Sequence, residues 1–220
     1  MWDAGGVTTP PPGLRERKKD ATRKALREAA LRLALEHGPD NVRVDDIAEA
    51  AGVAPRTYNN YFSSREQAIV AAVTADREAR VAAAVAARPA GVPLSEAVTD
   101  AIVDQYAGPG GRDRDVLALV TARPALREAF LAAAADIEDP LAAALAGRLG
   151  EHGAGTAEVL SASVAAAVRI ALRRWVRPVT DSGLVVVSGD LPDLLRAALA
   201  PLAPALDGAG TRLPLSRLWT

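Results

Sequence analysis

The sequence predicts an all-α protein: an N-terminal helix–turn–helix domain of three helices, then a larger helical domain, with about nine helices in all. Half of the residues are apolar but only 4% are aromatic, and alanine, the strongest helix former, is abundant. Apolar residues recur every three or four positions in the long segments, and Gly- and Pro-rich stretches separate these segments.

The composition narrows the class of protein. The chain contains no cysteine, which excludes disulfide frameworks and thiolate metal sites and fits a reducing cytoplasm. No run of about 18 apolar residues is free of charge, so we expect no membrane span. Residues 1–13 include three consecutive prolines and lack the basic and apolar regions of a signal peptide, so we expect a disordered arm. A cytoplasmic location is the resulting expectation.

The charges are unevenly distributed, although the net charge is only −1. Residues 14–27 carry seven basic side chains and two acidic ones, and the acidic excess lies further along the chain. A small basic footprint on a more acidic body suits a DNA-binding protein. The alternative interpretation is the solvated start of a helix.

The N-terminal domain begins with a helix expected over 15–37, which Gly38 and Pro39 end. Its inner face holds Leu26, Ala29, Ala30, Leu33 and Ala34. Two short helices, over 44–51 and 55–61, follow.

A tight turn separates these short helices. Gly52 stands where a left-handed residue ends a helix without steric cost. Pro55 stands at the first position of the next helix, where its missing N–H is no loss. Because such a motif presents its second helix to the DNA major groove, this stretch predicts DNA binding.

A fourth helix is expected from Ser64, where Ser64 and Gln67 form a capping box, to about Arg88, before Pro89. A helix of about 24 residues is about 36 Å long at 1.5 Å per residue. It would therefore leave the DNA-binding domain and enter the next domain.

The rest of the chain predicts further helices. They cover 94–107, 113–122, 124–149, 156–177 and 190–206. Pro140 lies inside the third of these and removes a hydrogen bond, so we expect a kink or a break there. The apolar segment 183–189 does not fit a helix, and is interpreted as a short strand or an apolar loop.

From Lys24 to Val70 the sequence resembles the tetracycline-repressor (TetR) family of bacterial regulators, in the style of its actinobacterial branch. The family pattern IAxxAGVSxxTxYxxFxSKExL stands here as IAEAAGVAPRTYNNYFSSREQAI. The resemblance implies a ligand-released repressor that binds a palindromic operator on double-stranded DNA as a homodimer, paired through its last two long helices. It also implies the following regions: DNA binding in 14–70, ligand binding and dimerisation in 71–207, and a C-terminal tail in 208–220.

Four positions depart from the family pattern, so the operator of better-known members does not carry over. Ala54 replaces the Ser that usually caps the recognition helix, a cap typically worth about 1 kcal/mol. Asn59 replaces a Tyr, and Arg65 replaces a Lys that opens the fourth helix. Arg43 replaces a Thr before the first short helix.

On a helix over 55–61, Arg56, Asn59 and Asn60 share an outward arc, and Tyr58 and Phe62 lie nearer the inner side. Arg pairs bidentately with guanine and Asn with adenine, so this arc predicts contacts to bases. The alternative for the two adjacent asparagines is a solvated, turn-prone segment.

Other side chains near this arc suit phosphate oxygens, because they carry hydroxyls or lie near helix N-termini. With the base-reading residues, the expected DNA-contacting set is Arg43, Pro55, Arg56, Thr57, Asn59, Asn60, Tyr61 and Arg65.

The resemblance also implies an effector cavity among the later helices. The expected wall residues are Gln105, Tyr106, Arg123, Phe130, Arg169 and Trp175, with ordinary packing as the alternative for each. Ala-rich walls suit an apolar effector, and Arg169 or Arg173 suits an anionic end. Some members of the resembled branch respond to acyl-CoA-like ligands, so the expected effector is apolar or acyl-CoA-like.

The sequence predicts no enzyme, no cofactor and no metal site, because it shows no nucleophile elbow, paired catalytic carboxylates or metal-ligand spacing. His37 and His152 each lie beside a glycine at a helix end, which suits caps better than bases. Two alternatives to a ligand-released repressor stay open: a transcriptional activator, and a constitutive DNA-binding protein without an effector.

Overall fold

The structure, a computed structural model, describes residues 13–74, 77–106, 123–150, 152–176 and 189–210. These residues form helices and turns with no strand among them, which confirms the all-α class. The chain divides into two compact units, one ending at Ala72 and one beginning at Val73, and each is described by itself. The N-terminal arm, the helix expected over 113–122, the segment 183–188 and the tail after Gly210 lie outside the described residues.

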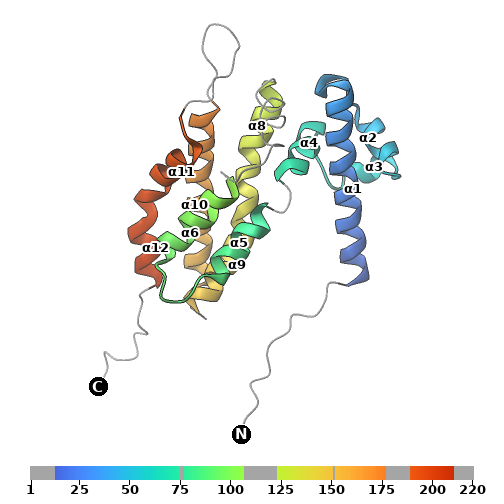
Figure 1. Cartoon of the computed structure of the whole chain (residues 1–220). Helices are drawn as coiled ribbons and strands as arrows, with labels where there is room; N and C mark the ends of the chain where they lie inside the picture. The colour runs from blue at the N-terminus through green and yellow to red at the C-terminus, as the bar shows by residue number, and fades with distance from the viewer. Residues whose placement is uncertain (1–12, 75–76, 107–122, 151, 177–188, 211–220) are drawn as a thin grey trace, which may run out of the picture. The chain divides into compact units, whose positions relative to one another are not determined.

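The first unit holds the helix–turn–helix. Its elements are α1 (Leu14–His37), the 3₁₀-helix η1 (Pro39–Asn41), α2 (Val44–Ala50), α3 (Pro55–Tyr58) and α4 (Arg65–Thr74) (Figure 1). α1 packs on η1 and α2, and α2 packs on α3. The fully buried side chains of this core include Leu26, Ala30, Ile47, Ala48, Tyr58 and Ile69.

The turn between α2 and α3 follows the predicted geometry. Gly52 has a φ of +69°, in the left-handed region. The N–H of Gly52 donates to the carbonyl of Glu49 at 2.9 Å, and the N–H of Val53 donates to that of Ala48 at 2.9 Å. These two bonds form a Schellman motif, which satisfies the last carbonyls of α2.

The fourth predicted helix is not described as one element. The structure gives α4 to Thr74 and α5 (Arg77–Ala87), and the residues 75–76 between them lie outside the described part. The Ala/Val-rich pattern predicted helix on both sides of this point.

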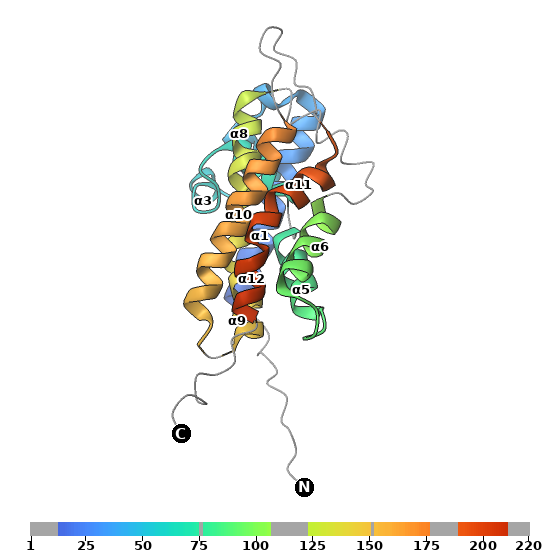
Figure 2. The same cartoon turned by 90° about the vertical axis from the view of Figure 1, so that its left-hand side faces the viewer.

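The second unit is built around α10. Its elements are α5, α6 (Leu94–Tyr106), α8 (Pro124–Ala132), η2 (Ala133–Ile137), α9 (Glu138–Leu149), α10 (Ala154–Trp175), α11 (Leu191–Leu199), η3 (Ala200–Leu202) and α12 (Ala203–Gly210). α10 contacts α8, α9, α11 and α12, and Figure 2 shows it running lengthwise beside α12. α5 packs on α6 and α9, and α6 packs on α11 and α12.

Two expected helices are interrupted. The helix predicted from Pro124 to Leu149 changes to the 3₁₀-helix η2 over Ala133–Ile137, so the interruption lies before Pro140 and not at it as predicted. Pro140 itself lies in the first turn of α9, where a missing N–H is tolerated. The single helix predicted over 190–206 is wrong: η3 separates α11 from α12, because Pro201 cannot continue the α-helical bonding.

Polar side chains fasten the second unit at two points. The guanidinium of Arg148 in α9 donates to the carbonyl of Val85 in the last turn of α5 at 3.2 Å, and to that of Val92 in the α5–α6 connection at 2.9 Å. The carboxylate of Asp207 in α12 accepts from the N–H of Ser95 at 2.9 Å and from its hydroxyl at 2.8 Å. Asp207 thus caps the N-terminus of α6 from another helix.

α10 is long and apolar enough, by length and composition, to cross a membrane. Half of its most apolar window is buried inside the unit, as expected for the core helix of a helical bundle, so the finding is weak evidence for a span.

Candidate nucleic-acid interface

The residues of the predicted base-reading arc are exposed in the first unit. Arg56 lies in α3, and Asn59 and Asn60 lie in the turn directly after it. α3 is shorter than the helix predicted over 55–61: it ends at Tyr58, and the chain continues with tighter bonds, from the Asn60 N–H to the Thr57 carbonyl at 3.1 Å. Arg56 and the two asparagines therefore lie on successive turns of one short helical segment, residues 55–61, which is called the α3 coil or recognition coil below.

The side chain of Tyr58 attaches the inner side of α3 to the core of the unit. Its side chain is fully buried, and its hydroxyl donates to the carbonyl of Ser64 at 2.7 Å. Burial, with a smaller contribution from the nearby Glu66 carboxylate, raises the pKa of Tyr58 to about 12. Phe62 packs beside it, with ring centroids 5.8 Å apart, so the inner side of this coil is apolar and buried.

The expected phosphate-contacting residues differ in their surroundings. Thr57 and Tyr61 are partly buried, while Pro55 is exposed at the start of α3. Ala54 precedes α3 and makes no side-chain cap, as its apolar methyl group requires. Arg43 is exposed before α2, and its N–H donates to the Asp46 carboxylate at 3.2 Å.

Arg65 is engaged within the domain. Its Nη1 donates to the carbonyls of Asp40 and Val42, each at 2.9 Å, and its Nε donates to Oε1 of Glu66 at 2.7 Å. Burial raises the pKa of Glu66, but hydrogen bonds from Arg65, from the backbone and from Ser64 outweigh burial, so the pKa lies below its usual value. Local sequence patterns do not predict the two bonds to Asp40 and Val42, because these residues lie 25 and 23 positions from Arg65.

The start of α4 carries part of the predicted capping box. The N–H of Gln67 donates to Oγ of Ser64 at 3.1 Å, as expected for the cap residue. The side chain of Gln67 reaches Ser63 instead of Ser64, accepting from its N–H at 2.8 Å. The cap is therefore real, but its reciprocal bond is displaced by one residue.

The basic footprint of α1 lies on the surface of the same unit. Its exposed basic side chains are Arg15, Arg17, Lys18, Lys19, Arg23 and Lys24. The guanidinium of Arg23 lies 5.7 Å from the centroid of the Phe62 ring, so the footprint reaches the core that supports the α3 coil.

The predicted effector residues lie on three helices of the second unit. Gln105 and Tyr106 are on α6, Arg123 directly precedes α8 and Phe130 lies within it, and Arg169 and Trp175 are on α10. Phe130 is buried, while Arg123 and Arg169 are exposed.

Two of these side chains already have partners on α5. The Gln105 amide oxygen accepts from Nε of Arg80 at 2.7 Å, and the Arg77 guanidinium lies 4.4 Å from the Tyr106 ring centroid. Burial raises the pKa of Tyr106, although Arg77 lowers it. The cavity assignment stays a prediction for all six residues.

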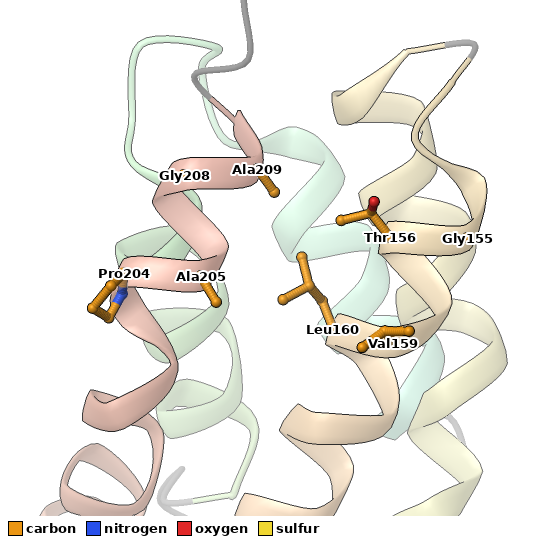
Figure 3. Close-up of a pocket in the computed structure, with 8 residues that line it drawn as sticks. All are labelled: Gly155, Thr156, Val159, Leu160, Pro204, Ala205, Gly208 and Ala209. Carbon is orange, nitrogen blue, oxygen red and sulfur yellow. The ribbon is translucent and has the colours of Figure 1, made fainter.

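The second unit has an apolar groove of about 500 Å³ between α10 and α12 (Figure 3). Its lining consists of Gly155, Thr156, Val159, Leu160, Pro204, Ala205, Gly208 and Ala209. Figure 3 shows Leu160 and Ala205 pointing toward each other across it. Val159 is 66% exposed, and Ile170, further along α10, is 45% exposed.

Residues 26–72 match the bacterial regulatory proteins of the tetR family. The chain is 34% identical over 152 residues to the HTH-type transcriptional regulator TcmR of Streptomyces glaucescens, a match that covers 63% of this chain and 65% of TcmR. It is 43% identical over 51 residues to the HTH-type transcriptional regulator BetI of Rhizobium meliloti (strain 1021), covering 23% of this chain and 25% of BetI. The chain thus matches less than two thirds of the length of each relative.

A solved TetR-family regulator from Streptomyces coelicolor A3 resembles the structure with a TM-score of 0.44 and 20% identity, covering 90% of this chain and 99% of that one. The similarity to the tetR family is therefore one of sequence, and it is concentrated in residues 26–72, where the structure has its helix–turn–helix. The N-terminal unit thus resembles the DNA-binding domain of the tetR family of bacterial regulatory proteins.

Proposed function

We propose that this protein is a cytoplasmic transcriptional regulator that binds a palindromic operator as a homodimer and is released from it by a small molecule. In this proposal residues 14–70 bind DNA, and residues 71–207 dimerise and bind the effector. The observation that carries it is the exposed set Arg56, Asn59 and Asn60, on a coil whose Tyr58 is buried and bonded to Ser64.

The chemistry of this set favours reading of bases. Arg56 has a planar fork of donors for guanine O6 and N7, and an Asn side chain matches adenine N6 and N7. Each good bidentate pair discriminates against a wrong base by about 1–3 kcal/mol. An exposed coil without charged neighbours of opposite sign in α3 leaves these groups available to DNA.

Contacts to phosphate would come from the flanks of the coil. Thr57 and Tyr61 offer hydroxyls, Arg43 offers a charge at the start of α2, and Pro55 shapes the start of α3. The basic footprint of α1 adds charge on the same unit. Such contacts fix the register on DNA and make the affinity depend on salt.

The groove between α10 and α12 supports a dimer through the last helices. Small residues such as Gly155, Ala205 and Gly208 allow a close approach of a second helix pair, and exposed Val159 offers apolar area. A palindrome with half-sites one DNA turn apart needs two recognition coils about 34–36 Å apart, which one chain cannot provide.

An effector would act by binding more tightly to a dimer whose two recognition coils are not spaced to enter successive major grooves of DNA. Ala-rich helices around Phe130 and Tyr106 suit an apolar or acyl-CoA-like molecule. Gln105, Arg123, Arg169 and Trp175 complete the proposed contacts. The same DNA-binding unit would equally serve an activator or a constitutive DNA-binding protein.

Selection of preferred DNA from random sequence, with the full-length chain, tests the proposal. We expect a palindrome with half-sites about one helical turn apart. Binding of all sequences with equal affinity would contradict it. Thermal shift across a metabolite panel then tests the effector, because a ligand of the native state raises the melting temperature.

A further inference from the structure

Arg65 joins the two ends of the helix–turn–helix. The carbonyls that it binds belong to Asp40 and Val42, just before α2, and Arg65 itself opens α4 just after the α3 coil. The motif between these points spans 44–62. A single guanidinium thus closes this segment into a loop, by two hydrogen bonds of 2.9 Å.

The coil that carries Arg56 is fixed to the same point. The Tyr58 hydroxyl binds the carbonyl of Ser64, the residue directly before Arg65. A chain of contacts therefore runs from the α3 coil through Tyr58 and Ser64 to Arg65, and on to Val42. Val42 is only 1% exposed, so the far end of this chain is set in the core.

The surroundings of Arg65 disfavour a phosphate. Its Nε and Nη1 are already bonded, and the carboxylate of Glu66 lies 2.7 Å from Nε. That negative charge offsets the guanidinium charge and would repel an approaching phosphate.

We propose that Arg65 is a positioning residue of the DNA-binding site, which holds the recognition coil in register with α2 and does not act by contacting phosphate. The inference rests on the proposed function. It predicts that loss of Arg65 lowers the preference for the operator over random DNA, because the base-reading side chains lose their fixed placement. Loss of a phosphate contact would instead weaken binding to all sequences alike.

The experiment compares Arg65→Lys and Arg65→Met with the wild type in the full-length chain. Arg65→Lys keeps the charge but loses the planar fork that binds both carbonyls. Arg32→Met, which removes an exposed arginine from α1, is the matched control. Affinity for the selected operator and for random DNA is measured across salt concentrations, at a temperature where circular dichroism shows each variant folded.

We expect both Arg65 variants to lower the operator-to-random affinity ratio about tenfold, the scale of one lost base pair contact. The salt slope should match that of the wild type, and Arg32→Met should keep the ratio. A phosphate contact would instead leave Arg65→Lys near wild type and reduce the slope of Arg65→Met by about 0.9. That result, or a lower melting temperature with an unchanged ratio, would overturn the positioning role.

A second measurement needs no DNA. Hydrogen exchange in the free protein should become about tenfold faster at the N–H groups of Asn60 and Tyr61 in both Arg65 variants, because the coil loses its fastening. If selection finds no preferred DNA, the proposed function fails, but the exchange measurement still tests whether Arg65 positions the recognition coil. Unchanged exchange at both groups would overturn its role.

Discussion

The hydroxyl of Tyr58 donates a 2.7 Å hydrogen bond to the carbonyl oxygen of Ser64, and this bond fastens the recognition coil to the start of α4. The Tyr58 side chain is 0% exposed, so its hydroxyl depends on this bond rather than on water. Because the pKa of Tyr58 is raised to about 12, the hydroxyl stays a donor throughout the neutral range.

Tyr58→Phe should therefore lower the free energy of unfolding of the DNA-binding unit by about 0.5–1.5 kcal/mol, the usual net contribution of one hydrogen bond. The Ser64 carbonyl keeps its other donor, the N–H of Ala68 at 3.3 Å. Urea unfolding followed by circular dichroism measures the change. Tyr61→Phe is the control, because Tyr61 is partly exposed and its hydroxyl can bind water. Equal stabilities for the two variants would contradict this account of the bond.

Gly52→Ala should lower the free energy of unfolding by about 1–2 kcal/mol, because a side chain at a φ of +69° is strained. Gly147→Ala is the matched control: Gly147 lies inside α9 with open space around its Cα, so alanine there should stabilise by about 0.5–1 kcal/mol. Thermal unfolding of both variants gives the sign of each change in stability. A destabilising Gly147→Ala would show that helix propensity does not govern that site.

Arg56→Ala should weaken binding to the selected operator by about 1–3 kcal/mol and binding to random DNA by much less. Fluorescence anisotropy with both DNAs measures the two losses. Equal losses on the two DNAs would mean that Arg56 contacts phosphate and does not read a base.

Val159→Glu should shift the protein from dimer to monomer and weaken operator binding, because it places a charge in the proposed interface. Leu35→Glu is the control: Leu35 is also an exposed apolar residue, at 56% exposure, but lies on α1. Sedimentation equilibrium measures the oligomeric state. A dimeric Val159→Glu protein would place the interface elsewhere.

Local rules predicted the helix–turn–helix well, because each of its signals is a short-range one. Gly52 ends α2 with the expected left-handed φ, and Ser64 caps α4. The inward side of Tyr58 and Phe62 also follows from helical spacing, and both are buried.

What the sequence missed depends on contacts between distant residues. Arg65 looked like a charge at a helix start, whereas its partners lie 23 and 25 positions away. The capping of α6 by Asp207 spans 112 positions and has no local signature. Pro201 offered a local signal for the break between α11 and α12, which the single predicted helix left unused.

The last prediction concerns Glu78, at the start of α5. Its Oε1 is buried without a hydrogen-bond partner among the described residues. Burial raises the pKa of Glu78, Asp136 adds to the rise, and Arg77, Arg80 and the backbone only partly offset it. The folded protein therefore holds the proton of Glu78 more tightly than the unfolded chain does.

The sign of the effect on stability follows from this proton. Below the ordinary Glu pKa of about 4.3 the carboxyl is protonated in both states, and it causes no penalty. As the pH rises, the unfolded chain loses the proton first, so Glu78 increasingly destabilises the fold until its folded pKa is passed.

Glu78→Gln should thus raise the melting temperature near pH 7 and lose this advantage near pH 4. Glu96→Gln, at an exposed position of α6, is the control and should change little at either pH. A constant difference between Glu78→Gln and the wild type across this range would mean that the buried carboxyl does not titrate with folding.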